Sequence, residues 1–155
     1  MSVTRGPVQW VIIPLKKYAQ FSGRASRAEY WWFNLAMLVI GLTFDLVDRA
    51  LESEIGVLGA LFNLVVLVPT ISVTVRRLHD TDRTGWWIWV PMIPATVLGF
   101  QASQAMLAER FEALELTPPE LTSIFAFVSA CALLTIFMIL RGTRGSNRFG
   151  PDPYG

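Results

Sequence analysis

The stretch Arg76-Arg-Leu-His-Asp-Thr-Asp-Arg-Thr-Gly-Trp-Trp87 decides the fold, because it is a short polar segment between two long apolar runs. Its first eight residues hold three arginines, two aspartates and the only histidine of the chain. The runs at 55–75 and 86–108 on either side are each long enough to cross a bilayer, which takes ~20 apolar residues in a helix. We therefore expect this stretch to be a polar loop held at a membrane surface, between two membrane-spanning helices.

Composition excludes the ordinary soluble classes. The chain has 155 residues, of which 53% are hydrophobic and only 16% are charged, whereas soluble domains average about 25% charged residues. Cys131 is the only cysteine and lies inside an apolar run, so we expect a small buried residue and no disulfide framework or metal cluster. The sequence therefore predicts a small polytopic membrane protein that forms a single domain, residues 1–155.

Four apolar segments predict an all-α bundle of four membrane-spanning helices. Ser26 and Glu29 have the spacing of a capping box, in which the serine accepts an amide proton and the glutamate reaches back, so the first helix should begin at about Arg27. Pro69 lies inside the second segment, where a proline bends a membrane helix without ending it. The third segment is the least regular, and we expect a kink near Pro91 to Pro94. The predicted spans are 28–48, 55–75, 86–108 and 121–140.

The two ends of the chain are predicted to lie outside these spans. Val8, Ile12 and Leu15 fall on one face at helical spacing and are followed by two lysines, which indicates a short helix at 8–18 lying in the membrane interface. Its apolar run is too short for a signal peptide and has no small-residue cleavage site, so we expect it to be retained. The tail, 141–155, is rich in turn-forming residues and carries no helical period.

The charges predict the orientation in the membrane. The N-terminal segment, the central loop and the tail hold 11 of the 13 Lys and Arg and four of the 12 Asp and Glu, which gives that side a net charge of +7. The acidic loops around 45–54 and 109–120 hold the other two basic and eight acidic residues, a net charge of −6. Short loops rich in Lys and Arg stay in the cytoplasm. We therefore expect both termini and the central loop to be cytoplasmic.

This topology brings three polar segments that are far apart in sequence, 24–29, 76–83 and 144–152, to the same membrane face. Arginine side chains there are suited to bind a phosphate, a lipid headgroup or a partner's carboxylate. The alternative is structural, with arginines that pair with nearby carboxylates and fix the ends of the helices, and both Arg76–Asp80 and Arg77–Asp80 have helical contact spacing. The candidate cluster for lipid or partner binding is Arg24, Arg27, Glu29, Arg76, Arg77, His79, Asp80, Arg83, Asn147 and Arg148, and Asp82 is a further pairing carboxylate.

His79 invites a catalytic interpretation, because a histidine oriented by a carboxylate can act as a general base. Asp80 is not its natural partner, since neighbouring residues of a helix point about 100° apart. A lone histidine has no second ligand for zinc, and the sequence contains no nucleophile elbow, HExxH pair or phosphate-binding loop. We therefore expect no catalytic residue, no metal, no cofactor and no nucleic-acid partner.

The predicted spans have no charged residue near a midplane, which counts against a proton relay or an ion-coupled carrier. Asn63, Gln101 and Gln104 are candidates to line a polar path through the membrane. Such residues otherwise form hydrogen bonds between neighbouring helices. The three residues therefore define an alternative hypothesis, a small transporter or channel built as an oligomer.

Three motifs stand in order along the chain: Phe21-Ser-Gly-Arg-Ala-Ser-Arg-Ala-Glu-Tyr-Trp-Trp-Phe33, then Arg76-Arg-Leu-His-Asp80 with Gly85-Trp-Trp87, and finally Gly145-Ser-Asn-Arg-Phe-Gly-Pro-Asp-Pro153. With these motifs the chain resembles the YhaH-like small inner-membrane proteins of bacteria, known only as a domain of unknown function. It departs from that pattern at Asp82 and Thr84, where glycine and serine are expected in many members. The resemblance implies four spans and a bacterial inner membrane, and it brings no activity. It suggests that the three cytoplasmic motifs are the working part.

The favoured hypothesis is a non-enzymatic scaffold or accessory subunit of the inner membrane. Its cytoplasmic cluster would bind anionic lipid or a protein partner, either as a homo-oligomer or with other membrane-protein subunits. The oligomeric transporter or channel is the second hypothesis. An enzyme acting on lipid headgroups is the third, and it requires His79 to face a pocket with Arg24, Arg77 or Arg148 nearby.

Overall fold

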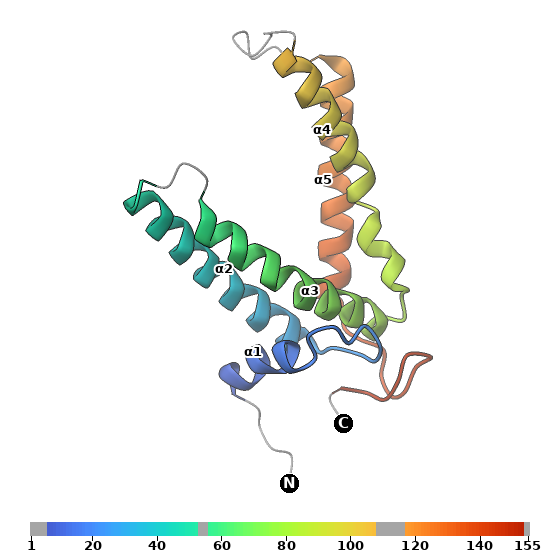
Figure 1. Ribbon diagram of the computed structural model, residues 1–155. Helices are drawn as coiled ribbons and strands as arrows, with labels where there is room; N and C mark the ends of the chain where they lie inside the picture. The colour runs from blue at the N-terminus through green and yellow to red at the C-terminus, as the bar shows by residue number, and fades with distance from the viewer. Residues whose placement is uncertain (1–5, 53–55, 108–116, 154–155) are drawn as a thin grey trace. The chain divides into compact units, whose positions relative to one another are not determined.

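The computed structural model describes residues 6–52, 56–107 and 117–153, and the regular elements in these ranges are all helices. The predicted all-α class is therefore confirmed. One isolated bridge, between Asn147 and Gly150 in the tail, is the β-type pairing found in this part of the chain. The elements, drawn in Figure 1, are α1 (Pro7–Lys16), α2 (Arg27–Ala50), α3 (Val57–Asp80), the 3-10 helix η1 (Gly85–Trp89), α4 (Met92–Leu107) and α5 (Pro118–Ile139).

Among the residues that the structure describes, three helices, α2, α3 and α5, are long and apolar enough to cross a membrane. They begin and end within five residues of the predicted spans. Asp45, Asp48 and Arg49 were predicted in an acidic loop, but they belong to the last turns of α2, because the helix continues beyond its apolar run. Glu52 follows the helix, whereas Glu54 and most of the second acidic loop lie outside the described residues.

The predicted span at 86–108 is not one continuous helix. The chain forms η1 up to Trp89, and α4 begins only at Met92. The interruption falls at Pro91, whose nitrogen has no proton to donate to a preceding turn. The expected kink is therefore a break between two helices. Since α4 has 16 residues, the count of four spans stays a prediction.

The chain divides into two compact units, and the first holds residues 1–85 and 141–155. In it α2 and α3 lie side by side as an antiparallel hairpin, and α1 packs against both (Figure 1). Apart from Gly59, the buried residues of α3 lie between Pro69 and Asp80. Protein therefore surrounds the second half of α3, whereas the first half exposes leucines and valines, as a helix facing lipid does. The small apolar core consists of Ala25, Phe33 and Val73, with Tyr30, Met37 and Val66 packed against it.

The end of α1 is tied to α3 by hydrogen bonds that follow from a proline. Pro69 cannot donate to the carbonyl of Val65 four residues earlier, so that oxygen lacks its helical partner. The hydroxyl of Tyr18 donates to it at 2.5 Å. One turn further along α3, the hydroxyl of Ser72 donates to the carbonyl oxygens of Lys17 (3.2 Å) and Gln20 (2.7 Å). The segment after α1 is thereby held against the second half of α3.

The second unit, residues 86–140, contains most of η1 together with α4 and α5, which pack against each other. Trp87 and Phe137 meet edge to face, with ring centroids 5.1 Å apart. The backbone N–H of Thr117 donates to the carboxylate of Glu120 at 2.6 Å, which is one half of a capping box at the start of α5. Cys131 is half-buried and free, so it is less enclosed than the sequence predicted.

Candidate functional site

Asp80, the last residue of α3, is the centre of a buried ionic cluster. Its side chain is fully buried, as are those of its two arginine partners. The Nε and Nη2 atoms of Arg24 both lie 2.9 Å from Oδ1 of Asp80. Arg77, one turn earlier on α3, donates from Nη1 to Oδ2. One carboxylate is therefore shared by two guanidinium groups, one from the segment before α2 and one from α3 itself.

Arg24 also holds the tail in place. Its Nη2 donates to the carbonyl oxygen of Thr143, and its Nη1 donates to that of Gly145, each at 2.6 Å. The N–H of Thr143 in turn donates to the carbonyl oxygen of Asp80 at 2.9 Å. A Cβ on Gly142 would lie only 2.0 Å from the Asp80 carboxylate, so this position has room only for glycine. The three motifs of the sequence thus meet at one point.

A second buried pair joins α2 to α3. Arg76 donates from Nη1 to Oε1 of Glu29, and both side chains are buried. Ser26 caps α2 by accepting the N–H of Glu29 at 3.1 Å, so α2 begins at Arg27 as predicted. Of the two pairings considered for Asp80, the structure has Arg77–Asp80, whereas Arg76 pairs with Glu29. The Nε and Nη2 atoms of Arg76 are buried and have no hydrogen-bond partner among the described residues.

His79 has one structural contact at a ring nitrogen and one on a ring face. Its Nδ1 lies 3.1 Å from the carbonyl oxygen of Gly23, and because a carbonyl only accepts, Nδ1 carries the proton. The ring stacks on Phe149, with centroids 3.9 Å apart and planes 2° from parallel. The guanidinium of Arg148 lies 4.8 Å from the centre of the same phenyl ring. His79 therefore fixes the tail against α3 through packing.

The remaining predicted cluster residues have different surroundings. Asn147 donates from Nδ2 to the carbonyl oxygen of His79 at 2.9 Å. Arg148 pairs with the exposed Asp82 at 3.1 Å. Arg83 is half-buried and donates to the carbonyl oxygen of Thr81 at 3.1 Å. Arg27 is half-buried and lies apart from the ion pairs of Asp80, as a lining residue of a separate cavity.

That cavity contains residues that the sequence analysis did not select. It has a volume of about 320 Å³ and is lined by Arg27, Arg141, Gly142, Thr143, Arg144 and Asp152. The sequence alone does not distinguish Arg141 and Arg144 from the other basic residues of the polar face. Their signal in the sequence was the Gly-Thr pair between two arginines, a small-residue step that lets the tail backbone approach Asp80.

The residues of the predicted polar path lie in both units. Asn63 is an exposed residue of α3 in the first unit. Gln101 and Gln104 lie on α4 and line a cavity of about 320 Å³ in the second unit, with Phe100, Ala105, Thr117, Pro119 and Glu120. The Oε1 atom of Gln101 is buried and has no hydrogen-bond partner in the described part of the chain. A path shared by all three residues stays a prediction.

The fold and this cluster define the class as an all-helical protein with apolar helices of membrane-spanning length, in which buried ion pairs join three distant segments. The chain belongs to the DUF805 family, described as proteins of unknown function, whose model matches residues 18–151. This confirms the resemblance found from the motifs.

Three relatives come from Escherichia coli (strain K12). Inner membrane protein YhaI is 32% identical over 146 residues, which cover 94% of this chain and 96% of the relative. Inner membrane protein YhaH is 31% identical over 150 residues, 94% and 97% of the two chains. Uncharacterized protein YiiR is 30% identical over 135 residues, 85% and 84% of the two chains. No solved structure matches. Both the relatives and the apolar helices fit a membrane protein.

Proposed function

We propose that this protein is a non-enzymatic scaffold or accessory subunit of the bacterial inner membrane, with four spans and both termini in the cytoplasm. Its cytoplasmic polar face would bind anionic lipid or a protein partner. The observation that carries the proposal is the meeting of three distant segments at Arg24, Asp80 and Thr143.

This meeting matters because the tail has no helix of its own. Charges buried away from water are costly unless they are paired, so a chain that buries three arginines and two carboxylates here holds a definite geometry at this end. The tail is consequently a surface of fixed shape. A fixed polar surface that carries excess positive charge is suited to recognise an anionic partner.

The orientation rests on the charge asymmetry, and single cysteines test it. In a Cys131→Ala background, Ser146→Cys places a thiol on the exposed tail, and Arg49→Cys places one near the exposed end of α2. We expect a membrane-impermeant maleimide to label Arg49→Cys in intact cells and Ser146→Cys only after the inner membrane is permeabilised. The reverse pattern would overturn the proposed orientation.

The binding function is tested by gentle extraction of the full-length protein from its own membrane, followed by native mass spectrometry. We expect a bound anionic phospholipid or a second protein at a defined ratio. Reincorporation into nanodiscs of phosphatidylglycerol or phosphatidylcholine is the matched comparison, and the anionic lipid should be retained preferentially. A bare oligomer with no lipid preference and no partner would contradict the proposal.

The cavity beside Gln101 favours a second candidate, the oligomeric transporter or channel. Two of the three predicted path residues line it, and one amide oxygen lacks a partner there among the described residues. Liposomes that contain the protein would then leak a small polar solute, and Gln101→Leu with Gln104→Leu should abolish the leak. Equal fluxes in protein-containing and empty liposomes would remove this candidate.

A further inference from the structure

Six arginines of the polar face fall into two groups that differ in their partners. Arg24, Arg76 and Arg77 are buried in the ion pairs, and Arg148 is engaged by Asp82. Arg141 and Arg144 are exposed, and no carboxylate or hydrogen-bond acceptor contacts them among the residues that the structure describes. These two arginines therefore form no ion pair or hydrogen bond that would stabilise the described part of the fold.

Both cations line the cavity of about 320 Å³ that Arg27 shares with them. This volume is at the lower end of the ~300–1,000 Å³ typical of small-molecule sites. Asp152 is the one acidic lining residue, so the four charged side chains sum to +2. One carboxylate oxygen of Asp152 accepts the N–H of Gly145 at 3.1 Å. The cavity is therefore a cationic site with room for an anion larger than water.

The backbone that carries Arg141 and Arg144 is held by the buried cluster. Gly142 and Thr143, the two residues between them, contact Asp80 directly. The carbonyl oxygens of Thr143 and Gly145 accept from Arg24. Because these bonds form when the chain folds, the two guanidinium groups start from a fixed backbone, which lowers the ordering cost of binding.

Arg27 adds a third cation from a different element. It is the first residue of α2, a helix of 24 residues. The N-terminal end of a helix carries a partial positive charge and favours anions. Arginines from α2 and from the tail thus line one cavity. This cavity includes the first residue of α2, at the end of the helix that favours an anion.

The chemistry of the site points to a phosphate. The planar guanidinium fork matches the oxygens of a phosphate in a bidentate way, and several forks around one cavity favour a tetrahedral anion with several oxygens. Trp31 and Trp32, one turn further along α2, are 44% and 42% exposed. Indole rings of membrane proteins gather at the level of the lipid headgroups. The phosphates nearest to this cavity are therefore those of the lipids.

We propose that Arg27, Arg141 and Arg144 form a binding site for the phosphate group of an anionic phospholipid headgroup. This inference rests on the proposed function, and it adds the ligand class and the residues. The buried cluster around Asp80 positions the site without touching the ligand.

The test is a native mass spectrometry titration of the purified full-length protein with phosphatidylglycerol. The double variant Arg141→Gln with Arg144→Gln removes two pocket cations. The matched variant Arg83→Gln with Arg148→Gln removes two other arginines of the cluster predicted from the sequence, which do not line the pocket and are bonded to Thr81 and Asp82 instead. We expect the pocket variant to weaken phosphatidylglycerol binding about tenfold or more, because it loses charge-assisted contacts to the phosphate. The matched variant loses no such contact and should change the binding by about twofold or less.

Two further experiments ask whether the bound phosphate belongs to a lipid and whether the planar shape of the guanidinium group matters. Inorganic phosphate and glycerol phosphate should compete only weakly, because they lack the acyl chains that bury apolar surface against the exposed helices. The variant Arg141→Lys with Arg144→Lys keeps the charge but loses the planar fork, and it should fall between wild type and the glutamine variant. The variants of Arg141 and Arg144 should unfold at the wild-type temperature, since these side chains are exposed. The matched variant should unfold only slightly below it, since the Arg148–Asp82 pair is about half exposed.

The outcomes separate the two proposals. If wild type prefers phosphatidylglycerol but both double variants lose it equally, the pocket assignment is wrong and the general lipid-binding function survives. Unchanged binding by the pocket variant would lead to the same conclusion. If soluble phosphate binds as tightly as the lipid, the lipid assignment is overturned. If wild type shows no preference for phosphatidylglycerol over phosphatidylcholine, the inference and the lipid-binding function both fail.

Discussion

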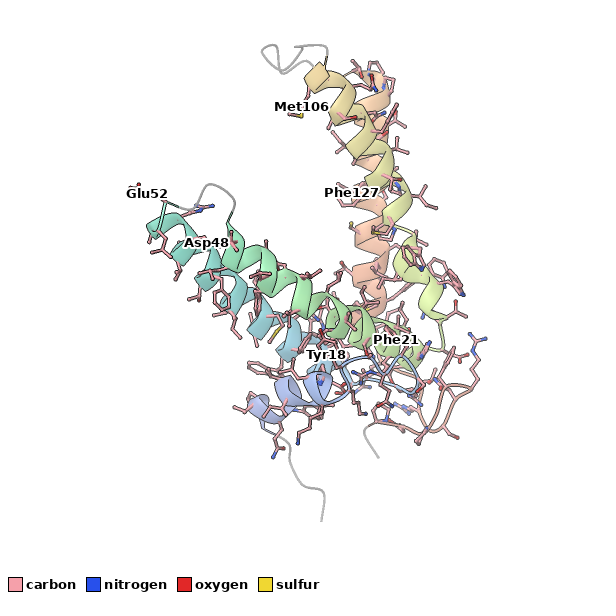
Figure 2. All side chains as sticks on the ribbon, in the orientation of Figure 1. Tyr18, Phe21, Asp48, Glu52, Met106 and Phe127 are labelled. Atoms are coloured by element: carbon pink, nitrogen blue, oxygen red, sulfur yellow. The ribbon has the colours of Figure 1, made fainter. Side chains whose placement is uncertain are left out.

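Both ends of the α2–α3 hairpin bury an aspartate, but the two aspartates have different partners. At one end, marked by Asp48 in Figure 2, the carboxylate accepts the backbone N–H groups of Leu58 (3.2 Å) and Gly59 (2.8 Å) at the start of α3. At the other end, Asp80 is the last residue of α3 and accepts from Arg24 and Arg77.

The difference follows from the polarity of a helix. Asp48 lies at the positive end of α3, where a carboxylate is favourable by itself. Asp80 lies at the negative end, where a carboxylate is unfavourable unless cations offset it. The partners of the two aspartates also lie at different distances along the chain. The two N–H groups that Asp48 accepts are 10 and 11 residues away, whereas Arg24 is 56 residues from Asp80. One end is therefore a local cap and the other is a tertiary cluster.

The largest effect should come from Asp80→Asn. This change leaves two buried arginines without their carboxylate, and breaking a buried ion pair costs about 3–5 kcal/mol. We expect a correspondingly lower free energy of unfolding in mixed micelles. Asp82→Asn is the matched control, because the Asp82–Arg148 pair is about half exposed and such pairs are worth about 1 kcal/mol or less. Equal losses for the two variants would show that the cluster does not stabilise this end.

Gly142→Ala tests whether the tail depends on close contact with Asp80. The new Cβ would lie 2.0 Å from a carboxylate oxygen, so the tail or the aspartate has to move. Overpacking of this kind costs about 1–3 kcal/mol. Hydrogen exchange of the tail amides should accelerate, with Thr143 affected most. The control is Gly99→Ala, where a Cβ meets open space, and matching exchange rates in both variants would refute the contact.

Asp48→Ala tests the end of the hairpin where Asp48 caps the start of α3. Loss of a side-chain helix cap costs about 0.5–2 kcal/mol, so the unfolding free energy should fall less than in Asp80→Asn. Asp45→Ala removes the same charge from the preceding turn of α2 and leaves both cap hydrogen bonds in place. If Asp45→Ala is as destabilising as Asp48→Ala, general charge and not the cap stabilises the start of α3.

Tyr18→Phe should have the smallest effect. It removes one partly exposed hydrogen bond to the Val65 carbonyl, worth about 0.5–1.5 kcal/mol. Pro69→Ala supplies the N–H that this carbonyl lacks, so the tyrosine hydroxyl should matter less in that background. A double-mutant cycle on unfolding free energies measures this coupling. A coupling of zero would mean that the proline does not explain the bond.

The local features of the fold could be predicted from the sequence. The apolar runs predicted α2, α3 and α5 to within five residues, and the Ser26 cap predicted the start of α2. These features depend on residues close together in the chain. The break at Pro91 was predicted as a kink, because a missing N–H shows in the sequence but the size of its effect depends on the surroundings.

The sequence predicted which polar segments contribute to the candidate site, but not which side chains pair within it. The topology expected from the charges put segments 24–29, 76–83 and 144–152 on one membrane face, and in the structure Arg24 contacts both Asp80 and the tail. The sequence alone could not assign Arg76 to Glu29, since one polar segment offers several arginines of equal chemistry. For the same reason it could not show that every side-chain nitrogen of Arg24 donates a hydrogen bond. Arg141 and Arg144 were missed because an exposed arginine and a buried one look alike in sequence.

The sequence by itself determined the class of this protein, because hydropathy and helix caps depend on residues that are neighbours along the chain. Only the tertiary structure decided which arginines are buried and which remain exposed at a cavity. For Arg24, that division depends on contacts across 56 positions to Asp80 and 126 positions to Gly150. Pairing of this kind is selected by the shape of the folded chain, since every guanidinium has nearly the same affinity for any carboxylate within reach.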